Sequence, residues 1–172
     1  FGDAKRLAAV NPLMRVPALV LEDGSVLVDS AAMLDHIDRR SAVAMRPAAG
    51  AARDAALRVE GLAVGLADKA VSLFYELRLH EKVSDVWARR CREQIAATAL
   101  ALEAEASRLT TPFFLGETLG HADIALGCAW RFVREAHPGL LAEQRLLSLV
   151  AQCAALEAMA PFRTVMQRFI PP

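Results

Sequence analysis

Two short stretches of the chain carry residues that could bind a small molecule, Val16-Pro17 and Asp29-Ser30. Pro17 begins an apolar run, and a proline is tolerated at the first residue of a strand because its missing N–H lies outside the ladder. An X–Pro bond can also be cis at modest cost. The sheet can therefore leave the N–H and C=O of Val16 unpaired, so that both can hydrogen-bond a peptide-like ligand. An ordinary strand start explains the same residues, and on sequence physics alone it is favoured.

The second stretch, Asp29-Ser30, stands where a helical pattern begins. Either side chain can act as the N-cap and accept hydrogen bonds from amides two or three residues further on. A helix N-terminus binds carboxylates through its free N–H groups and its dipole, and an acid beside it can bind an ammonium group. A ligand with an α-amino and an α-carboxylate group on one carbon would satisfy both, although capped helices occur in all classes of protein.

A third pattern lies in the segment TLGHADIALG, residues 118–127. If Gly120 is the N-cap, Asp123 is the third helical residue and can accept a hydrogen bond from the Gly120 N–H, which is half of a capping box. Leu119 and Ile124 then stand at the two positions of a hydrophobic staple. We interpret this pattern as a folding signal and not as a catalytic one.

The elements that position these motifs differ in periodicity along the chain. Residues 1–41 contain two short apolar runs, PALVLE and SVLV, which read as strands joined by a turn at Asp23-Gly24 and followed by a helix. Residues 42–50 read as a linker, with a proline and a glycine but no period. Residues 51–172 are helical in pattern, with helices expected over about 51–80, 84–108, from Gly120 onward, over about 140–159, and in a short last segment. The sequence therefore predicts an α/β unit followed by an all-α unit.

Composition excludes several classes of function. The chain has 172 residues, 55% of them apolar, and a formal net charge of +0, so no basic excess attracts nucleic acid. No uninterrupted apolar run reaches the ~20 residues of a membrane span. Cys91, Cys128 and Cys153 are widely spaced and have no neighbour at metal-ligand spacing. We expect buried reduced thiols in a cytoplasmic protein without a metal site.

The three motifs together resemble those of the glutathione S-transferase superfamily, and the resemblance covers nearly the whole chain. It implies a partial thioredoxin-like N-terminal domain at residues 1–41 and a glutathione-transferase-type helical bundle at residues 51–172. It also implies that the Val16–Pro17 bond is cis, that the Val16 backbone pairs with the cysteinyl part of glutathione, and that Asp29 and Ser30 hold the γ-glutamyl end.

The chain departs from the family pattern at three positions. Asp29 replaces the usual glutamate and is shorter by one methylene, and Gly120 replaces the usual Ser or Thr cap. Arg15 stands where a lysine is common and could pair with a ligand carboxylate. Phe74 and Trp130 are our candidates for the apolar wall of an electrophile pocket, although a role as core aromatics explains them equally well.

The implied activity is conjugation of the glutathione thiol, as co-substrate, to a small hydrophobic electrophile, in a homodimer packed through the helices at 51–80 and 84–108. Gly61 and Gly65 would let those helices approach closely. The family's first β-α-β unit carries the residue that activates the thiol, and we expect it upstream of Phe1, so no catalytic residue is assigned. A non-enzymatic binding or assembly module, and an isomerase or dehalogenase on the same scaffold, remain alternatives.

Overall fold

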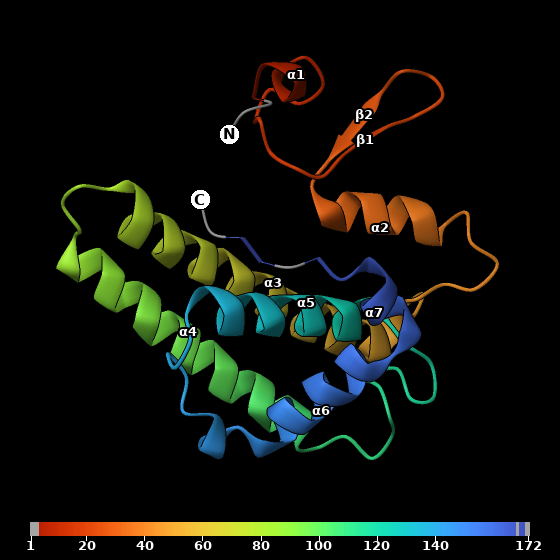
Figure 1. The fold of residues 1–172 in the computed structure, drawn as a ribbon. Helices are drawn as coiled ribbons and strands as arrows, with labels where there is room; N and C mark the ends of the chain where they lie inside the picture. The colour runs from red at the N-terminus through yellow and green to blue at the C-terminus, as the bar shows by residue number, and fades with distance from the viewer. Residues whose placement is uncertain (1–3, 168, 171–172) are drawn as a thin grey trace. The chain divides into compact units, whose positions relative to one another are not determined.

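The computed structural model describes residues 4–167 and 169–170. The chain forms two compact units, Phe1–Met45 and Arg46–Pro172. The first holds a small sheet and short helices, and the second is helical apart from its connecting segments (Figure 1). The predicted fold class, a partial thioredoxin-like unit followed by a helical bundle, is confirmed.

The first unit is built around an antiparallel hairpin. Its register pairs Ala18 with Val28 and Val20 with Val26. The expected turn at Asp23-Gly24 is present. Gly24 has a φ of 82°, a backbone conformation that favours glycine, and the Leu21 N–H donates to the Ser25 carbonyl at 2.8 Å across the turn. The elements of this unit are α1 (Ala4–Ala8), β1 (Ala18–Val20), β2 (Val26–Val28) and α2 (Ser30–Asp38).

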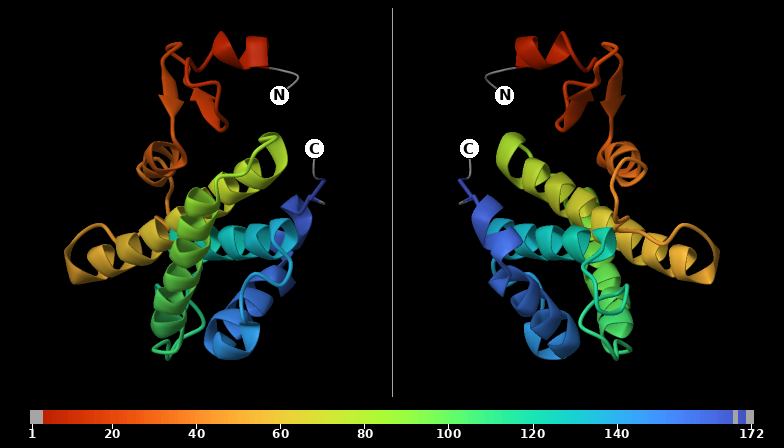
Figure 2. Two further views of the ribbon diagram at one scale, coloured as in Figure 1. Left: turned by 90° about the vertical axis from the view of Figure 1, so that its left-hand side faces the viewer. Right: turned by 90° about the vertical axis from the view of Figure 1, so that its right-hand side faces the viewer.

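The second unit packs its helices around two long antiparallel ones, α3 and α4, which contact each other along the bundle (Figure 1; two further views in Figure 2). The helix α5 packs against α3, and α6 packs against α4 and α5. The elements are α3 (Gly50–Leu79), α4 (Asp85–Ala106), α5 (His121–Ala136), a 3-10 turn η1 (Glu143–Arg145), α6 (Leu147–Ala158) and α7 (Ala160–Val165).

One predicted helix is shorter than expected. The pattern over residues 140–159 becomes a 3-10 turn and then α6, which begins only at Leu147. The reason is a side chain from another helix. The Glu103 carboxylate of α4 accepts the Ser148 N–H at 3.1 Å and the Leu149 N–H at 2.7 Å, which fixes the first turn of α6.

The core of the second unit is a single cluster of buried side chains from α3 to α6. On α3 the buried residues Leu66, Ala70 and Leu73 recur at helical spacing and form one apolar face. The largest fully buried side chains opposite them include Ile95 and Leu102 of α4, Leu126 and Trp130 of α5, and Leu149 and Leu156 of α6. None of the helices in the described part of the chain is long and apolar enough to span a bilayer.

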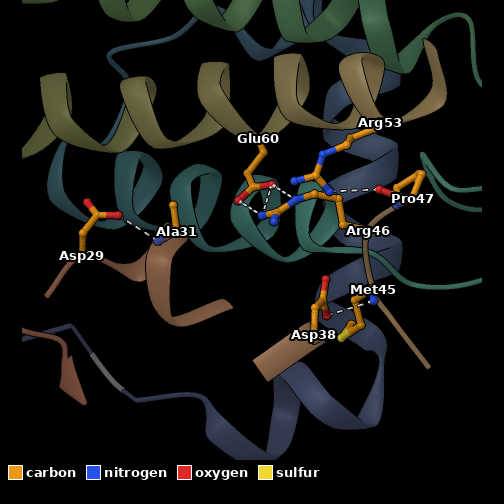
Figure 3. A network of polar contacts seen from close by, with 8 residues as sticks. All are labelled: Asp29, Ala31, Asp38, Met45, Arg46, Pro47, Arg53 and Glu60. Carbon is orange, nitrogen blue, oxygen red and sulfur yellow. Dashed lines mark hydrogen bonds and ion pairs between the residues drawn. The ribbon is translucent and has the colours of Figure 1, made fainter. Parts of the chain in front are cut away.

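The segment before α3 is fastened by a buried ion pair that the sequence did not predict. The Arg46 guanidinium forms three hydrogen bonds with the Glu60 carboxylate, at 2.7, 2.8 and 3.2 Å, and both residues are buried (Figure 3). Arg53 also donates to the Pro47 carbonyl at 3.0 Å. Because losing one partner would leave an unpaired buried charge, this pair fixes the course of the chain into α3.

Candidate binding site

The loop that leads into β1 is organised by one buried side chain, Asn11, which is only 1% exposed. Its Nδ2 donates to the Arg15 carbonyl at 2.7 Å, and its Oδ1 accepts the Leu13 N–H at 2.9 Å. The backbone of residues 11–15 is therefore held in one shape directly before Val16. The sequence alone indicates no role for the Asn11 side chain, although an asparagine before a proline is a recognisable turn signal.

Val16 lies outside the sheet, and its peptide bond to Pro17 is cis, as expected. The ladder begins at Ala18, and the Val16 side chain is 78% exposed. Across residues 4–167 and 169–170, no group hydrogen-bonds to the Val16 N–H or C=O. One donor and one acceptor of the backbone are thus available to an extended ligand.

Asp29 is the N-cap of α2, and Ser30 is the first residue of that helix. The Asp29 Oδ1 accepts the Ala31 N–H at 2.9 Å, so one carboxylate oxygen is used locally (Figure 3). Asp29 also has a φ of 86°, a region that non-glycine residues occupy at a cost of about 1–3 kcal/mol. Such strained residues cluster at functional sites, and this one holds an exposed acid at the start of a helix.

The hairpin brings these two motifs to the same end of the sheet. Since Ala18 pairs with Val28, the residues that enter β1 and those that leave β2 lie next to each other. Val16, Asp29 and Ser30 are all exposed there, and so is Arg15. The arrangement offers a backbone donor and acceptor, a carboxylate, and the positive end of a helix, which together suit the backbone edge and the amino-acid head of a peptide.

The two aromatic candidates lie in the second unit and are buried. Trp130 is 1% exposed and belongs to the core cluster. Phe74 is 5% exposed and makes edge-to-face contacts with His137 and Phe169, at ring centroid distances of 6.3 and 5.6 Å. Both therefore pack against protein side chains here, and their role in an electrophile pocket stays a prediction.

The cap of α5 involves one more bond than the sequence indicates. The Gly120 N–H donates to Asp123 Oδ2 at 3.0 Å, as the pattern predicts, and the Phe114 N–H donates to Oδ1 at 3.2 Å. Gly120 has no side chain, so the reciprocal half of the box is absent. Burial raises the pKa of Asp123 above its usual range, against the opposing effect of these two hydrogen bonds. Leu119 and Ile124 are half-buried beside the cap.

One cysteine differs from expectation. Cys91 and Cys153 are buried free thiols, as expected. Cys128 is an exposed free thiol, so the expectation that all three thiols are buried is wrong for this residue of α5. Within the described part of the chain, no three His, Cys, Asp or Glu side chains gather closely enough to hold a metal ion.

Two family profiles match the sequence. The glutathione S-transferase N-terminal domain matches residues 2–40, and the glutathione S-transferase C-terminal domain matches residues 85–166. No curated protein matches the chain.

Solved structures give the same result over nearly the whole chain. A glutathione transferase family member from Pseudomonas fluorescens Pf-5, with bound S-(propanoic acid)-glutathione, is 30% identical, with a TM-score of 0.82 over 93% of this chain and 81% of that one. A glutathione S-transferase from Methylobacillus flagellatus KT with glutathione bound is 27% identical, with a TM-score of 0.83 over 92% and 78%. A third, from Methylobacterium radiotolerans JCM 2831 in complex with glutathione sulfonate, is 25% identical, with a TM-score of 0.77 over 95% and 81%.

Proposed function

The chain belongs to the glutathione S-transferase family, and we propose that it binds glutathione at the end of the hairpin where Val16, Asp29 and Ser30 meet. The proposed reaction joins the glutathione thiol to a small apolar electrophile. Glutathione is then a co-substrate and not a permanent cofactor. The proposal concerns the binding residues of this chain, and no residue of it is assigned to the activation of the thiol.

The observation that carries the proposal is the unpaired backbone of Val16 beside the capped start of α2. Glutathione is a tripeptide with a γ-glutamyl head, so it presents both a backbone-like edge and an amino-acid group. The edge fits the Val16 N–H and C=O. The head fits the Asp29 carboxylate, through its ammonium group, and the helix N-terminus, through its carboxylate. Arg15 is exposed in the same loop and is our candidate for a second ligand carboxylate.

In the proposed reaction the thiolate sulfur attacks an electrophilic carbon, a C–S bond forms, and the leaving group departs with the electron pair of the broken bond. The thiolate is the nucleophile, so the protein must stabilise it relative to the thiol. Holding the two reactants at attack distance supplies much of the remaining rate enhancement. The residues of the first unit would bind and orient glutathione.

Three finer features belong to the same proposal. We place the protein in the cytoplasm, in accord with its three free thiols. We also propose a homodimer formed through α3 and α4. A non-enzymatic module that binds glutathione without catalysis is the second candidate.

The test compares two aspartates that make the same local hydrogen bond. Asp29 accepts the Ala31 N–H at 2.9 Å, and Asp23 accepts the Ser25 N–H at 2.9 Å at the opposite end of the hairpin. Asp29→Asn keeps an oxygen for the cap but removes the charge that would bind the ammonium group. We expect Asp29→Asn to weaken glutathione binding about tenfold by calorimetry, and Asp23→Asn to leave it unchanged.

A second ligand makes the assignment specific. Cysteinylglycine lacks the γ-glutamyl head, so its affinity should be the same for the unchanged protein and for Asp29→Asn. If the two substitutions weakened glutathione binding equally, the head would not lie at Asp29. If the unchanged protein bound no glutathione at about millimolar concentration, the site itself would be wrong.

A further inference from the structure

The loop of residues 12–16 takes all its hydrogen bonds within the described chain from one residue, Asn11. The Asn11 Oδ1 accepts the Leu13 N–H at 2.9 Å, and its Nδ2 donates to the Arg15 carbonyl at 2.7 Å. The main-chain carbonyl of Asn11 accepts the Met14 N–H at 2.9 Å. No other group among the described residues hydrogen-bonds to this loop, so its conformation depends on Asn11.

Asn11 is itself held in one place. It is 1% exposed, and its N–H donates to the Leu7 carbonyl of α1 at 2.7 Å. One side-chain partner is a donor and the other is an acceptor, so only one orientation of the amide group satisfies both. Met14 has a φ of 49°, which a non-glycine residue keeps only when its surroundings hold it there. The loop therefore has a single built conformation.

The bond to Arg15 has a direct consequence for Val16, because the Arg15 carbonyl and the Val16 N–H belong to the same peptide group. That peptide bond is trans, so the group is planar and its C=O and N–H point in opposite directions. With the carbonyl fixed on the buried Asn11 side chain, the Val16 N–H must point away from Asn11. Asn11 thus sets the direction of the backbone donor at Val16.

We propose that Asn11 is a positioning residue for glutathione: by holding the Arg15 carbonyl, it orients the Val16 N–H to donate to the cysteinyl carbonyl of the ligand. This role rests on the proposed glutathione site and explains how its backbone donor is kept in place before the ligand arrives. Asn11 acts through the peptide plane and does not itself touch glutathione. Because the loop is ordered on folding, the ligand does not have to order it on binding.

The test variant is Asn11→Asp, which keeps the shape of the side chain and an acceptor for the Leu13 N–H. It removes the Nδ2 donor and places an oxygen against the Arg15 carbonyl, so the peptide group loses its restraint. Ser25→Ala is the control, because it also removes one short hydrogen bond, from the Ser25 hydroxyl to Asp23 Oδ1 at 2.6 Å, in the turn at the far end of the hairpin.

Two ligands show whether the lost interaction is the one at Val16. The first is glutathione, and the second is an analogue in which a trans CH=CH group replaces the amide between cysteine and glycine. The analogue has the same charges and shape but lacks the cysteinyl carbonyl. By calorimetry, the unchanged protein and Ser25→Ala should prefer glutathione about fivefold or more. In Asn11→Asp the preference should fall to about twofold or less, and any effect of the new charge cancels in this ratio.

The outcomes separate this role from the proposed function. If the unchanged protein bound neither ligand at about millimolar concentration, the glutathione site itself would be wrong. If it bound both ligands equally, glutathione binding would stand but the Val16 N–H would not donate to that carbonyl. If Asn11→Asp weakened both ligands by the same factor, Asn11 would maintain the fold and would not position the donor.

A measurement on the unchanged protein needs no variant. The Val16 N–H has no acceptor among the described residues, and an amide in a flexible loop has an NMR order parameter below about 0.6. Because Asn11 holds the carbonyl of the same peptide group, we expect a rigid value of about 0.85 for the Val16 amide without ligand, from ¹⁵N relaxation. A value below about 0.6 would overturn the proposal, even where Asn11→Asp failed to fold.

Discussion

At the scale of single residues, Asp123 shows how one buried carboxylate can define a helix start. It is fully buried, and its two oxygens accept the N–H groups of Gly120 and Phe114. The first bond satisfies the N-cap amide of α5, and the second ties in the loop before it. Removing the carboxylate would leave the buried Gly120 amide and the half-buried Phe114 amide without acceptors, and a buried group left this way costs about 1–3 kcal/mol.

We therefore expect Asp123→Ala to lower the free energy of unfolding by at least about 1 kcal/mol, with little change in glutathione affinity. Denaturant unfolding and calorimetry measure the two quantities. Asp85→Ala removes an exposed first-turn acid from α4 and is the matched control. It should lower the free energy of unfolding by only about 0.3 kcal/mol. An unchanged melting temperature combined with lost glutathione binding would show that Asp123 acts on the ligand and not on the fold.

The raised pKa of Asp123 adds a pH dependence to this prediction. A carboxyl group whose pKa is higher in the folded state stabilises the fold most when protonated, below its ordinary pKa of about 3.9. That contribution is lost as the pH rises through the folded value. The loss caused by Asp123→Ala should therefore be larger in acid than at neutral pH.

The sequence predicted the hydrogen bonds that join residues close together in the chain. The Asp29 cap, the Asp23-Gly24 turn and the Asp123–Gly120 bond join residues at most three positions apart, so their spacing alone predicts them. The bond from Phe114 to Asp123 spans nine positions, and the Arg46–Glu60 pair spans fourteen. Their partners are set by how helices and loops pack, and no periodicity in the sequence reports that.

At the scale of elements, α6 depends on a side chain far away in sequence. Glu103 of α4 accepts the Ser148 and Leu149 amides, so an acid from one helix caps the N-terminus of another. Burial acts to raise the pKa of Glu103, but the hydrogen bonds from Leu149 and Ser148 outweigh it and the pKa is lowered. A negative charge is also favoured at this end of the helix dipole. The boundary that the sequence misplaced is thus set by tertiary contact.

We predict that Glu103→Gln lowers the free energy of unfolding by about 1–2 kcal/mol at neutral pH, because the charge is lost and the new NH₂ group faces a backbone N–H. Since the folded pKa is lowered, the contribution of Glu103 is present above its ordinary pKa of about 4.3 and disappears as the pH falls through the folded value. Urea unfolding across this range should show the two proteins converging in acid. Glu93→Gln, on an exposed face of α4, is the control and should change little at any pH. If the loss of unfolding free energy caused by Glu103→Gln did not vary with pH, the charge of Glu103 would not be what stabilises the start of α6.

At the scale of the whole molecule, one face of α3 is left open. Gly61 and Gly65 were expected to permit close helix packing, but a Cβ on either would meet no atom of the described chain within 4 Å. Close approach inside the chain therefore does not explain them. Leu57 and Val64, 40% and 44% exposed, flank Gly61 at helical spacing, so this stretch of α3 exposes apolar side chains in the described part of the chain. A second copy is the partner we propose for it.

The homodimer prediction follows from this open face. Replacing Gly61 and Gly65 by leucine should leave the single chain folded, and even stabilise α3, since leucine favours helix over glycine by up to about 0.8 kcal/mol per site. The same side chains would hold two α3 helices apart. Sedimentation velocity at micromolar concentration should show a dimer for the unchanged protein and a shift toward monomer for the double variant. Ala52→Leu, an exposed change on a different face of α3, should remain dimeric. A monomeric unchanged protein, or a double variant that still dimerises fully, would place the interface elsewhere or remove it.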